Sequence, residues 1–271
     1  MDHIRAGNRT FYDDVGWQKA EGGQFTDSAL FEDLRPVSAE YIHRCHLRVN
    51  LYLSPTGRFL VDAASGPVQF PEYLTYSEGY DKRICVDFSF RALVEARKTV
   101  GDRGAYVLAD ITKLPLRDGA ADAVVSINTI YHVPEDEQAE AFNELHRVLA
   151  PGRTAVVVYA WHHSVLMRLF EIPMRAVRLL ARLAGRRSAG PTVPLYFRPK
   201  GHRWFVRRPW PFRYRIAVWR AVSVPFLEFY VRARLGGRRL LSFVFWLEER
   251  MPGLMGRLGQ YPLIVMAKDE A

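Results

Sequence analysis

Five short apolar segments, separated by stretches with helical periodicity, dominate the chain up to Trp161. They are residues 58–62, 83–88, 105–110, 122–129 and 154–161. Strands that alternate with helices pair in parallel, because each helix carries the chain back to the end of the sheet at which the next strand begins. The pattern therefore predicts an α/β fold built on a doubly wound, mostly parallel sheet.

After Trp161 the chain loses this regular alternation. Pro173 would kink the first helix of this part, and proline, arginine and aromatic residues are dense in the loop that follows it. Two further strands after a long insertion would complete a sheet of seven strands with an antiparallel pair. The expected elements are a helix over 164–187, a loop over 191–213, a strand over 214–224, mostly helix over 226–250 and a strand over 261–268.

The basic residues are concentrated in the last part of the chain. Residues 162–262 hold 20 of the 38 Arg and Lys residues but 4 of the 29 Asp and Glu residues. This asymmetry points to an anionic partner, namely membrane headgroups, a phosphorylated substrate or nucleic acid. The expected segments are an N-terminal helical leader (1–57), a core (58–161), a basic, mostly helical insertion between strands five and six (162–213) and a closing strand–helix–strand (214–271).

The composition also bounds the expected compartment. Cys45 and Cys85 are the two cysteines of the chain; they are too few for a disulfide framework and not spaced as a metal pair, so the cytoplasm is expected. The N-terminal sequence MDHIRAGNRTFYDD has acidic residues and no apolar core, so we expect no signal peptide. The sequence has no run of about 18 uncharged apolar residues, so we expect no transmembrane span.

Polar residues follow four of the expected parallel strands at the point where each strand ends. Asp62, Asp87 and Asp110 end the first three strands, and Asn128 to His132 follow the fourth. Because ligands of open α/β sheets bind beyond the carboxyl ends of the strands, we expect these side chains to line one site. A carboxylate can accept hydrogen bonds from both hydroxyls of a ribose or from an exocyclic amine. The competing interpretation is that each acid merely caps the following helix or turn.

Four sequence blocks resemble one family in their order and spacing. They are 62-DAASGP-67, 86-VDFS-89, 109-ADITKLPLRDGAADAVVSINTIYHV-133 and 144-ELHRVLAPGR-153. Across residues 58–160 the chain is similar to the class I S-adenosylmethionine-dependent methyltransferases, in their small-molecule and lipid-modifying branch. The most specific part of the match is LPLRDGAADAVVS with RVLAPGR after it. The resemblance implies a Rossmann-like fold, methyl transfer, and S-adenosyl-L-methionine as the cofactor.

The resemblance also implies a set of cofactor contacts. Tyr12, in an FYDDVGW stretch similar to the leader of such enzymes, would close over the cofactor. The other contacts would run from its methionine part to its adenine. Asp62, Ala63, Ala64, Ser65 and Gly66 would lie under the methionine part with Asn128 near it, Asp87 would bind the ribose hydroxyls, and Phe88, Asp110 and Ile111 would contact the adenine.

The first of these loops departs from the family pattern in its glycines. Ala64 stands at the usual first glycine and Val68 at the third. Ser65 and Gly66 still let the backbone approach a ligand, and Val68 is expected at the start of the next helix, where its side chain can point away. S-adenosylmethionine has no pyrophosphate, so it does not need the close backbone approach of a dinucleotide. The loop therefore favours this cofactor over a dinucleotide.

Histidines at the same edge of the sheet are the candidate bases. Methyl transfer from a sulfonium is an in-line displacement in which positioning supplies much of the acceleration, but an oxygen acceptor also has to lose a proton. His132 follows the fourth strand and His162 the fifth, which makes them the candidate catalytic residues, with packing or capping as the alternative. His163 and His202 are further candidates. No cluster has metal-ligand spacing, so no metal is expected.

The acceptor and the partners depend on the basic insertion. We expect a small or lipid-like acceptor, with negative charge as an option. Residues 164–187 predict a basic amphipathic helix, which either contacts an anionic membrane at its inner face or covers the active site as a lid. Nucleic acid is not an expected partner, because the aromatic residues are scattered and no RNA-binding module accompanies the charge.

Two other classes of function stay open. The altered glycines are compatible with a catalytically inactive methyltransferase-like fold that serves as a binding or scaffold protein at a membrane. A nicotinamide-dependent oxidoreductase would also have a strand–loop–helix with an acid about 20 residues further on. Binding of NAD in place of S-adenosylmethionine would favour the oxidoreductase.

Overall fold

A seven-stranded sheet forms the centre of the molecule in a computed structural model, which describes residues 2–20, 22–183 and 195–270. The strand order is β3-β2-β1-β4-β5-β7-β6, and β7 is antiparallel to both of its neighbours while β1 to β5 are parallel. This confirms the predicted doubly wound sheet and its closing antiparallel pair. The strands are β1 (Gly57–Ala63), β2 (Tyr80–Asp87), β3 (Gly104–Leu108), β4 (Ala121–Ile127), β5 (Leu149–Val158), β6 (Arg213–Arg220) and β7 (Tyr261–Ala267).

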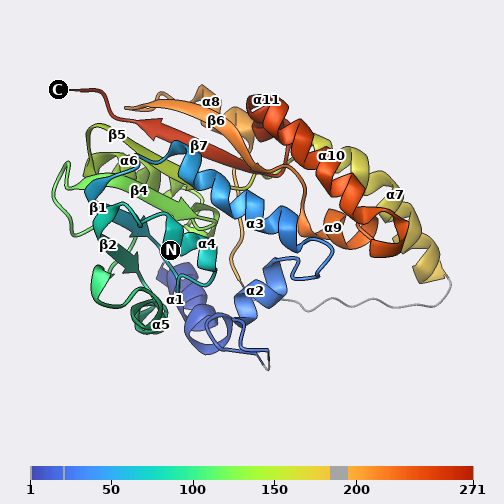
Figure 1. The fold of residues 1–271 in the computed structure, drawn as a ribbon, viewed down its shortest axis with the longest axis horizontal. Coiled ribbons are helices and arrows are strands. Elements are labelled where there is room, and N and C mark those ends of the chain that lie inside the picture. Colours follow the sequence, from blue (N-terminus) through green and yellow to red (C-terminus); the bar gives the residue numbers. More distant parts are fainter. Residues whose placement is uncertain (1, 21, 184–194, 271) are drawn as a thin grey trace.

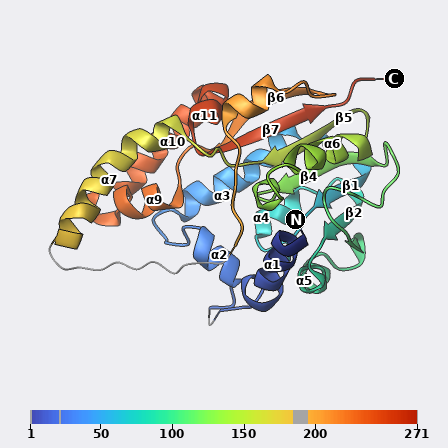
Figure 2. The ribbon, with the colours of Figure 1, turned by 180° about the vertical axis from the view of Figure 1, so that it is seen from behind.

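Helices cover both faces of the sheet (Figures 1 and 2). Ser89 caps α5 by accepting a hydrogen bond from the backbone N–H of Ala92 at 3.1 Å, and Gly101 ends that helix at φ 65°, as the sequence predicted. The helices are α1 (Asp2–Phe11), α2 (Thr26–Phe31), α3 (Ala39–Leu47), α4 (Pro71–Thr75), α5 (Phe90–Val100), α6 (Gln138–Val148), α7 (Val165–Leu183), α8 (His202–Arg207), α9 (Val224–Tyr230), α10 (Gly237–Arg250) and α11 (Pro252–Leu258), with short π or 3-10 turns η1 (Tyr12–Gly16), η2 (Arg48–Tyr52), η3 (Gly101–Arg103), η4 (Ile130–His132) and η5 (Ala233–Leu235).

The core lies in two apolar layers, one on each face of the sheet. Successive side chains of a strand point to opposite faces, so Val61 packs with Phe142 and Leu145 of α6, whereas Leu60 packs on the other face with Leu93 of α5. These side chains are all at most 5% exposed. Burial on both faces is why the parallel strands are continuous apolar runs in the sequence.

Several element boundaries differ from the prediction. The expected helix 226–250 is divided into α9 and α10: the backbone turns extended at Val231 and Arg232, and α10 begins after Gly236, which is left-handed at φ 74°. The strand expected at 214–224 ends at Arg220, since Ser223 caps α9. The strand expected at 154–161 starts earlier, since β5 begins at Leu149, and α8 lies in the expected loop 191–213. The predicted helix 164–187 is seen as α7, with residues 184–187 outside the described part.

The leader is tied to the C-terminal helices. Tyr41 and Cys45 of α3 pack in one apolar cluster with Met167 of α7 and Leu241 of α10. Arg48, next to α3 in the sequence, forms a buried ion pair with Glu248 of α10 at 2.7 Å. The predicted division of the chain at residue 57 therefore does not separate two independent cores, because leader and closing segment share this cluster.

Close packing of α11 on β6 generates a test of this arrangement. A Cβ atom built on Gly256 would lie 2.1 Å from the carbonyl oxygen of Ala217, whereas one on Gly253, in the same helix, would lie 3.6 Å from the nearest atom. We expect Gly256→Ala to lower the free energy of unfolding by about 1–3 kcal/mol through overpacking. Gly253→Ala is the matched control and should be neutral or stabilising, because alanine favours a helix. Chemical denaturation compares them, and equal stabilities would contradict this packing.

Candidate active site

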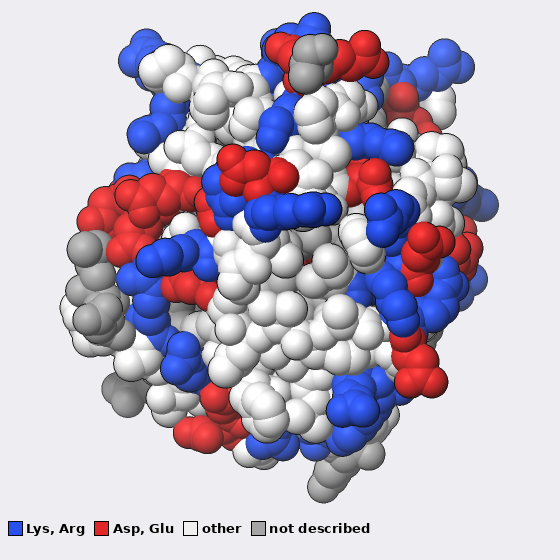
Figure 3. Space-filling view, turned by 90° about the vertical axis from the view of Figure 1, so that its left-hand side faces the viewer, with Lys and Arg blue, Asp and Glu red and all other residues white. Residues whose placement is uncertain are grey.

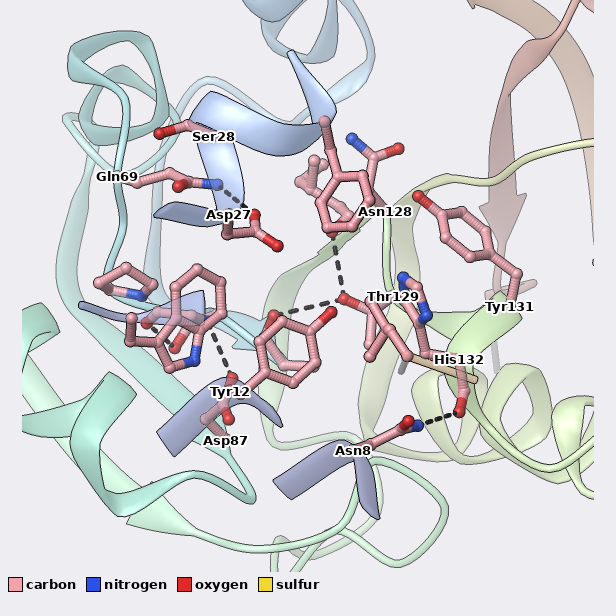
Figure 4. Close-up of a pocket in the computed structure, with 18 of the residues that line it drawn as sticks. Asn8, Tyr12, Asp27, Ser28, Gln69, Asp87, Asn128, Thr129, Tyr131 and His132 are labelled. Atoms are coloured by element: carbon pink, nitrogen blue, oxygen red, sulfur yellow. Dashed lines mark hydrogen bonds between the residues drawn. The ribbon is translucent and has the colours of Figure 1, made fainter. Parts of the chain in front are cut away.

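The carboxyl ends of the parallel strands open onto one cavity of about 590 Å³. Its walls come from the ends of β1, β2 and β4, from α1, η1 and α2 of the leader, and from α9. Figure 4 shows side chains of these elements facing the same space. The volume lies in the range of about 300–1,000 Å³ that is typical of ligand pockets. The sheet order reverses between β1 and β4, which is where open α/β sheets bind ligands.

Most of the predicted cofactor residues line this cavity. Ala63 does not, because its side chain is fully buried in the core beneath. His132 lines the cavity, whereas His162 is exposed and lies outside the lining. The predicted residues in the wall are Asp62, Ala64, Ser65, Gly66, Asp87, Phe88, Asp110, Ile111 and Asn128.

Asp87 ties the end of β2 to the first loop. Its side chain is 3% exposed, and its two oxygens accept backbone hydrogen bonds from Gly66 and Ser89, both at 2.8 Å. Burial raises the pKa of Asp87 to about 6, although the two N–H donors lower it. Each carboxylate oxygen keeps a further lone pair. Asp87 can therefore accept hydrogen bonds from ligand hydroxyls while it holds the loop in place.

Asp110 is fixed by a residue that the sequence did not single out. Arg5 of α1 donates to Asp110 from Nε at 2.6 Å, and the backbone and hydroxyl of Thr112 donate to the other oxygen at 2.8 and 2.7 Å. Burial would raise the pKa of Asp110, but these donors together lower it. Beside it, Ile111 and Phe88 supply apolar surface to the cavity. An acid flanked by apolar side chains suits a purine with an exocyclic amine.

Asp62 is engaged below the loop. It is 3% exposed and forms an ion pair with Arg83 of β2, with 3.0 Å between Arg83 Nε and the carboxylate. Arg83 also donates to the carbonyl oxygen of Tyr73 at 2.5 Å. Asp62 was expected under the methionine part of the cofactor. In the structure one of its oxygens, Oδ2, is hydrogen-bonded to Arg83. Asp62 therefore supports the cavity wall as well as lining it.

The first loop has three left-handed residues in alternation, and two of them are not glycine. Ala64, Gly66 and Val68 have φ values of 57°, 55° and 54°. The expectation that Val68 starts a helix is wrong: α4 starts at Pro71, and the Val68 side chain is 2% exposed within the apolar layer. The family's glycine positions are thus conformational requirements of this loop, which the chain meets with strained residues.

Asn128 at the end of β4 carries a free hydrogen-bonding group. It too is left-handed, at φ 57°, and its side-chain Oδ1 is buried without a hydrogen-bond partner among the described residues. Asn128 also lines the cavity beside Ala64. A buried amide oxygen without a donor is costly. It fits an ammonium group such as that of a methionine moiety, which could donate to it.

The leader covers the cavity. Tyr12 stacks on Trp17, with ring centroids 4.9 Å apart, and meets Phe88 and His132 edge to face at 6.2 Å each. Asn8 donates from its side chain to the carbonyl oxygen of His132 at 2.8 Å. These contacts place the leader against the ends of β2 and β4, where the resemblance implied that Tyr12 closes over the cofactor.

The two predicted catalytic histidines lie in different surroundings. His132 is partly buried, and its Nδ1 lies 2.7 Å from the carbonyl oxygen of Tyr196, so Nδ1 is the donor and Nε2 carries no proton in the neutral ring. Burial lowers the pKa of His132 to about 4, and the ring is neutral at pH 7. His162 lies beside His163 at the surface, with ring centroids 3.8 Å apart and the ring planes tilted by 51°.

A second part of the wall was missed by the sequence analysis. It lies between α2 and α9 and contains Phe31, Asp27, Glu32, Arg220 and Glu228. Glu32 and Arg220 form a buried ion pair; burial would raise the pKa of Glu32, but Arg220 lowers it to about 2. These residues form no local motif, because they come from the leader and from segments more than 180 residues further on. Only the fold brings them together.

Among the described residues, no group of three or more His, Cys, Asp or Glu side chains is arranged to hold a metal ion. The same part of the chain has no helix that is both long and apolar enough to cross a bilayer.

In sequence, the chain is similar to methyltransferases. The family model described as a methyltransferase domain matches residues 61–157. An uncharacterized methyltransferase of Mycobacterium leprae (strain Br4923) is 32% identical over 151 residues, which cover 55% of this chain and 51% of that protein. The chain thus spans about half the length of this curated relative.

Solved structures agree on the fold. A putative methyltransferase of Haloferax volcanii, in complex with the activator Trm112, superposes with a TM-score of 0.53 at 15% identity and covers 86% of this chain and 92% of that one. Phosphoethanolamine N-methyltransferase 1 of Haemonchus contortus gives a TM-score of 0.59 at 11% identity, covering 100% of this chain and 50% of that one. At these identities the likeness shows the fold alone.

The strained loop yields a test of its own. A left-handed conformation costs a non-glycine residue roughly 1–2 kcal/mol. Glycine avoids this cost, but it loses more conformational entropy on folding, which offsets about 0.5–1 kcal/mol of the gain. We therefore expect Ala64→Gly to raise the free energy of unfolding by about 0.5–1 kcal/mol. Ala63→Gly, one residue earlier and fully buried in β1, should be destabilising. Thermal unfolding of both variants decides, and a destabilised Ala64→Gly would show that the loop is not strained.

Proposed function

We propose that the chain is an enzyme that transfers a methyl group from S-adenosylmethionine to a small or lipid-like acceptor, because residues 61–157 match a methyltransferase domain. One observation carries the proposal: Asp87, Asp110 and Asn128, from three separate strand ends, face one cavity. The domain supplies no covalent chemistry of its own. Its residues hold the two reactants in line and exclude water.

We propose a set of cofactor contacts that this geometry supports. Asp87 would accept from the ribose hydroxyls, and Asp110 from the adenine amino group, with Ile111 against the ring. The unpartnered Oδ1 of Asn128 would accept from the methionine ammonium. The sulfonium supplies an activated methyl group when it is bound. The acceptor would enter through the part of the cavity between α2 and α9.

Cofactor binding is tested most directly at Asp87. Asp87→Asn keeps the shape of the side chain but removes the charge and one acceptor, so we expect S-adenosylmethionine to bind at least tenfold more weakly. Asp81→Asn, on the exposed amino-terminal part of the same strand, is the matched control and should bind as the wild type does. Isothermal titration calorimetry measures both. Undiminished binding by Asp87→Asn would contradict the assignment of the cavity as the S-adenosylmethionine site.

The acceptor is not expected to be anionic where it reacts. Each arginine in the described cavity wall is paired with a carboxylate. These arginines are Arg5, Arg83 and Arg220. A phosphate or carboxylate would have to displace one of these partners. The earlier option of an acceptor with negative charge is therefore disfavoured at the reacting end.

His132 is a poor base in this cavity. Its pKa of about 4 is well below the usual pKa of imidazole, so the ring accepts a proton poorly at neutral pH. We propose that its ring orients the acceptor through the unprotonated Nε2, and we assign no role to the surface residue His162.

A scaffold without catalysis is the competing proposal. It rests on Ala64 and Val68 at glycine positions, yet these residues adopt the same left-handed conformation that glycine would. Labelled methyl groups that pass from S-adenosylmethionine into a cell extract in the presence of the protein would exclude it, and mass spectrometry would identify the product.

We also propose that the enzyme works at an anionic membrane surface. Its α7 stripe consists of apolar side chains that recur three, four or seven positions apart on one side of the helix and are 53–76% exposed. Met167 and Met174, on another side of α7, attach the helix to the body. The stripe comprises Val165, Leu169, Ile172, Leu179 and Leu183.

Arginines accompany the stripe. Arg168, Arg175, Arg178 and Arg182 lie along α7 with a single acid, Glu171, which pairs with Arg175 at 2.6 Å. Apolar burial together with cationic side chains favours an anionic lipid interface, whereas a second copy of the chain would bring two rows of arginines together. The end of the molecule that bears the C-terminus instead mixes acidic and basic residues (Figure 3). Figures 1 and 2 show α7 at the opposite end.

Vesicle binding tests the stripe. With vesicles of phosphatidylcholine and phosphatidylserine, we expect the wild type to sediment and the double variant Leu169→Ser/Leu179→Ser to bind at least tenfold more weakly, because two exposed leucines no longer enter the interface. The control Leu51→Ser/Val94→Ser changes two exposed apolar residues elsewhere (70% and 40% exposed) and should sediment normally. Equal binding by all three proteins, or none by the wild type, would contradict the proposal.

A further inference from the structure

The charges of the cavity wall do not balance. Its three arginines are each committed to a carboxylate: Arg5 to Asp110, Arg83 to Asp62 and Arg220 to Glu32. Asp87, which is proposed to face the ribose, forms no ion pair with the described residues. Apart from it, two further acids of the wall, Asp27 and Glu228, form no ion pair among the described residues. The described residues of the acceptor's part of the cavity therefore offer unneutralised negative charge and no uncommitted guanidinium.

Asp27 is the more enclosed of these two acids. It lies in the first turn of α2, and one oxygen, Oδ2, accepts a hydrogen bond from the side-chain amide of Gln69 at 3.2 Å. Figure 4 shows the carboxylate turned toward the space between Tyr12 and Asn128. Burial raises the pKa of Asp27 to about 6, although Gln69 lowers it. A carboxylate in this state is stabilised by a cation beside it.

Aromatic rings line the same cavity as this carboxylate. They include the rings of Tyr12, Tyr73 and Tyr131. Phe31 and Phe70 also line this part of the wall. Ring faces attract organic cations, most strongly when the site is desolvated. One carboxylate among several rings matches an ammonium group on an apolar body.

We propose that the acceptor is an amine, held as its ammonium ion by Asp27 and the surrounding aromatic rings, and that the reaction is N-methylation. The inference rests on the proposed methyl transfer and names its substrate class. Asp27 and the proposed cofactor residues lie in one cavity, and the Asp27 carboxylate is turned toward the space beside Asn128, the residue proposed to contact the methionine end of the cofactor (Figure 4). Neither a phosphate nor a carboxylate finds a free cation at this position.

The step balances in atoms and charge. The ammonium gives one proton to the Asp27 carboxylate, which frees the lone pair of the nitrogen. The nitrogen then forms a bond to the methyl carbon as the carbon–sulfur bond breaks, and the electrons of that bond stay on sulfur. The products are a methylated ammonium ion and neutral S-adenosylhomocysteine, and the proton on Asp27 passes to water. The carboxylate is then ready to hold the charged product or the next ammonium.

Three probes with the same apolar chain and different head groups test the proposal: octylammonium, octanol and octanoate. With the full chain saturated with S-adenosylhomocysteine, calorimetry should show octylammonium binding at least tenfold more tightly than the other two. Asp27→Asn should lose this preference and keep its affinity for S-adenosylhomocysteine within about twofold. Asp14→Asn, an exposed acid of η1, is the matched control and should behave as the wild type.

The outcomes separate this inference from the proposed function. Equal, weaker or absent binding of octylammonium by the wild type would overturn the amine site even if Asp27→Asn did not fold. Loss of S-adenosylhomocysteine affinity in a folded Asp27→Asn would make Asp27 a cofactor ligand, which also overturns it. In both cases the methyltransferase proposal would stand as long as the wild type binds S-adenosylhomocysteine, because its own tests are the binding by Asp87→Asn and the transfer of labelled methyl groups.

Discussion

Buried arginine–carboxylate pairs hold the functional end of this molecule together. Arg83 joins β2 to Asp62 of β1, and Arg220 joins β6 to Glu32 beside α2. All four side chains are at most 8% exposed. Loss of one partner from such a pair leaves an uncompensated charge, which costs about 3–5 kcal/mol. The pairs therefore fix the distances between strand ends, and they decide which carboxylates remain available to a ligand.

The fold could be predicted from the sequence where one element decides its own conformation. The runs that became β1 and β4 are apolar because both faces of the sheet are covered, and Ser89 and Gly101 mark the ends of α5. Prediction failed where distant packing or a single backbone angle decides. Val231 and Arg232 turn extended between α9 and α10, although the sequence on both sides is helical.

The candidate site was predictable on the side of the cofactor, because strand ends supply it and strands were recognisable. Asp87, Asp110 and Asn128 line the cavity. Two groups were not predictable. Arg5 acts on Asp110 across 105 positions, and Asp27 has no motif around it. Their roles depend on how the leader folds back over the sheet, which no local pattern records. The expected start of a helix at Val68 failed for a related reason, since its left-handed backbone is imposed by the loop.

The folding back of the leader has a consequence for turnover. Asn8, Tyr12 and Trp17 form part of the wall around the proposed cofactor site, and Asn8 is hydrogen-bonded to the backbone of His132. Under the proposed function, detachment of this segment from the sheet would widen the way out for the spent cofactor. A local opening of the amino-terminal segment would then accompany the chemical step in each catalytic cycle.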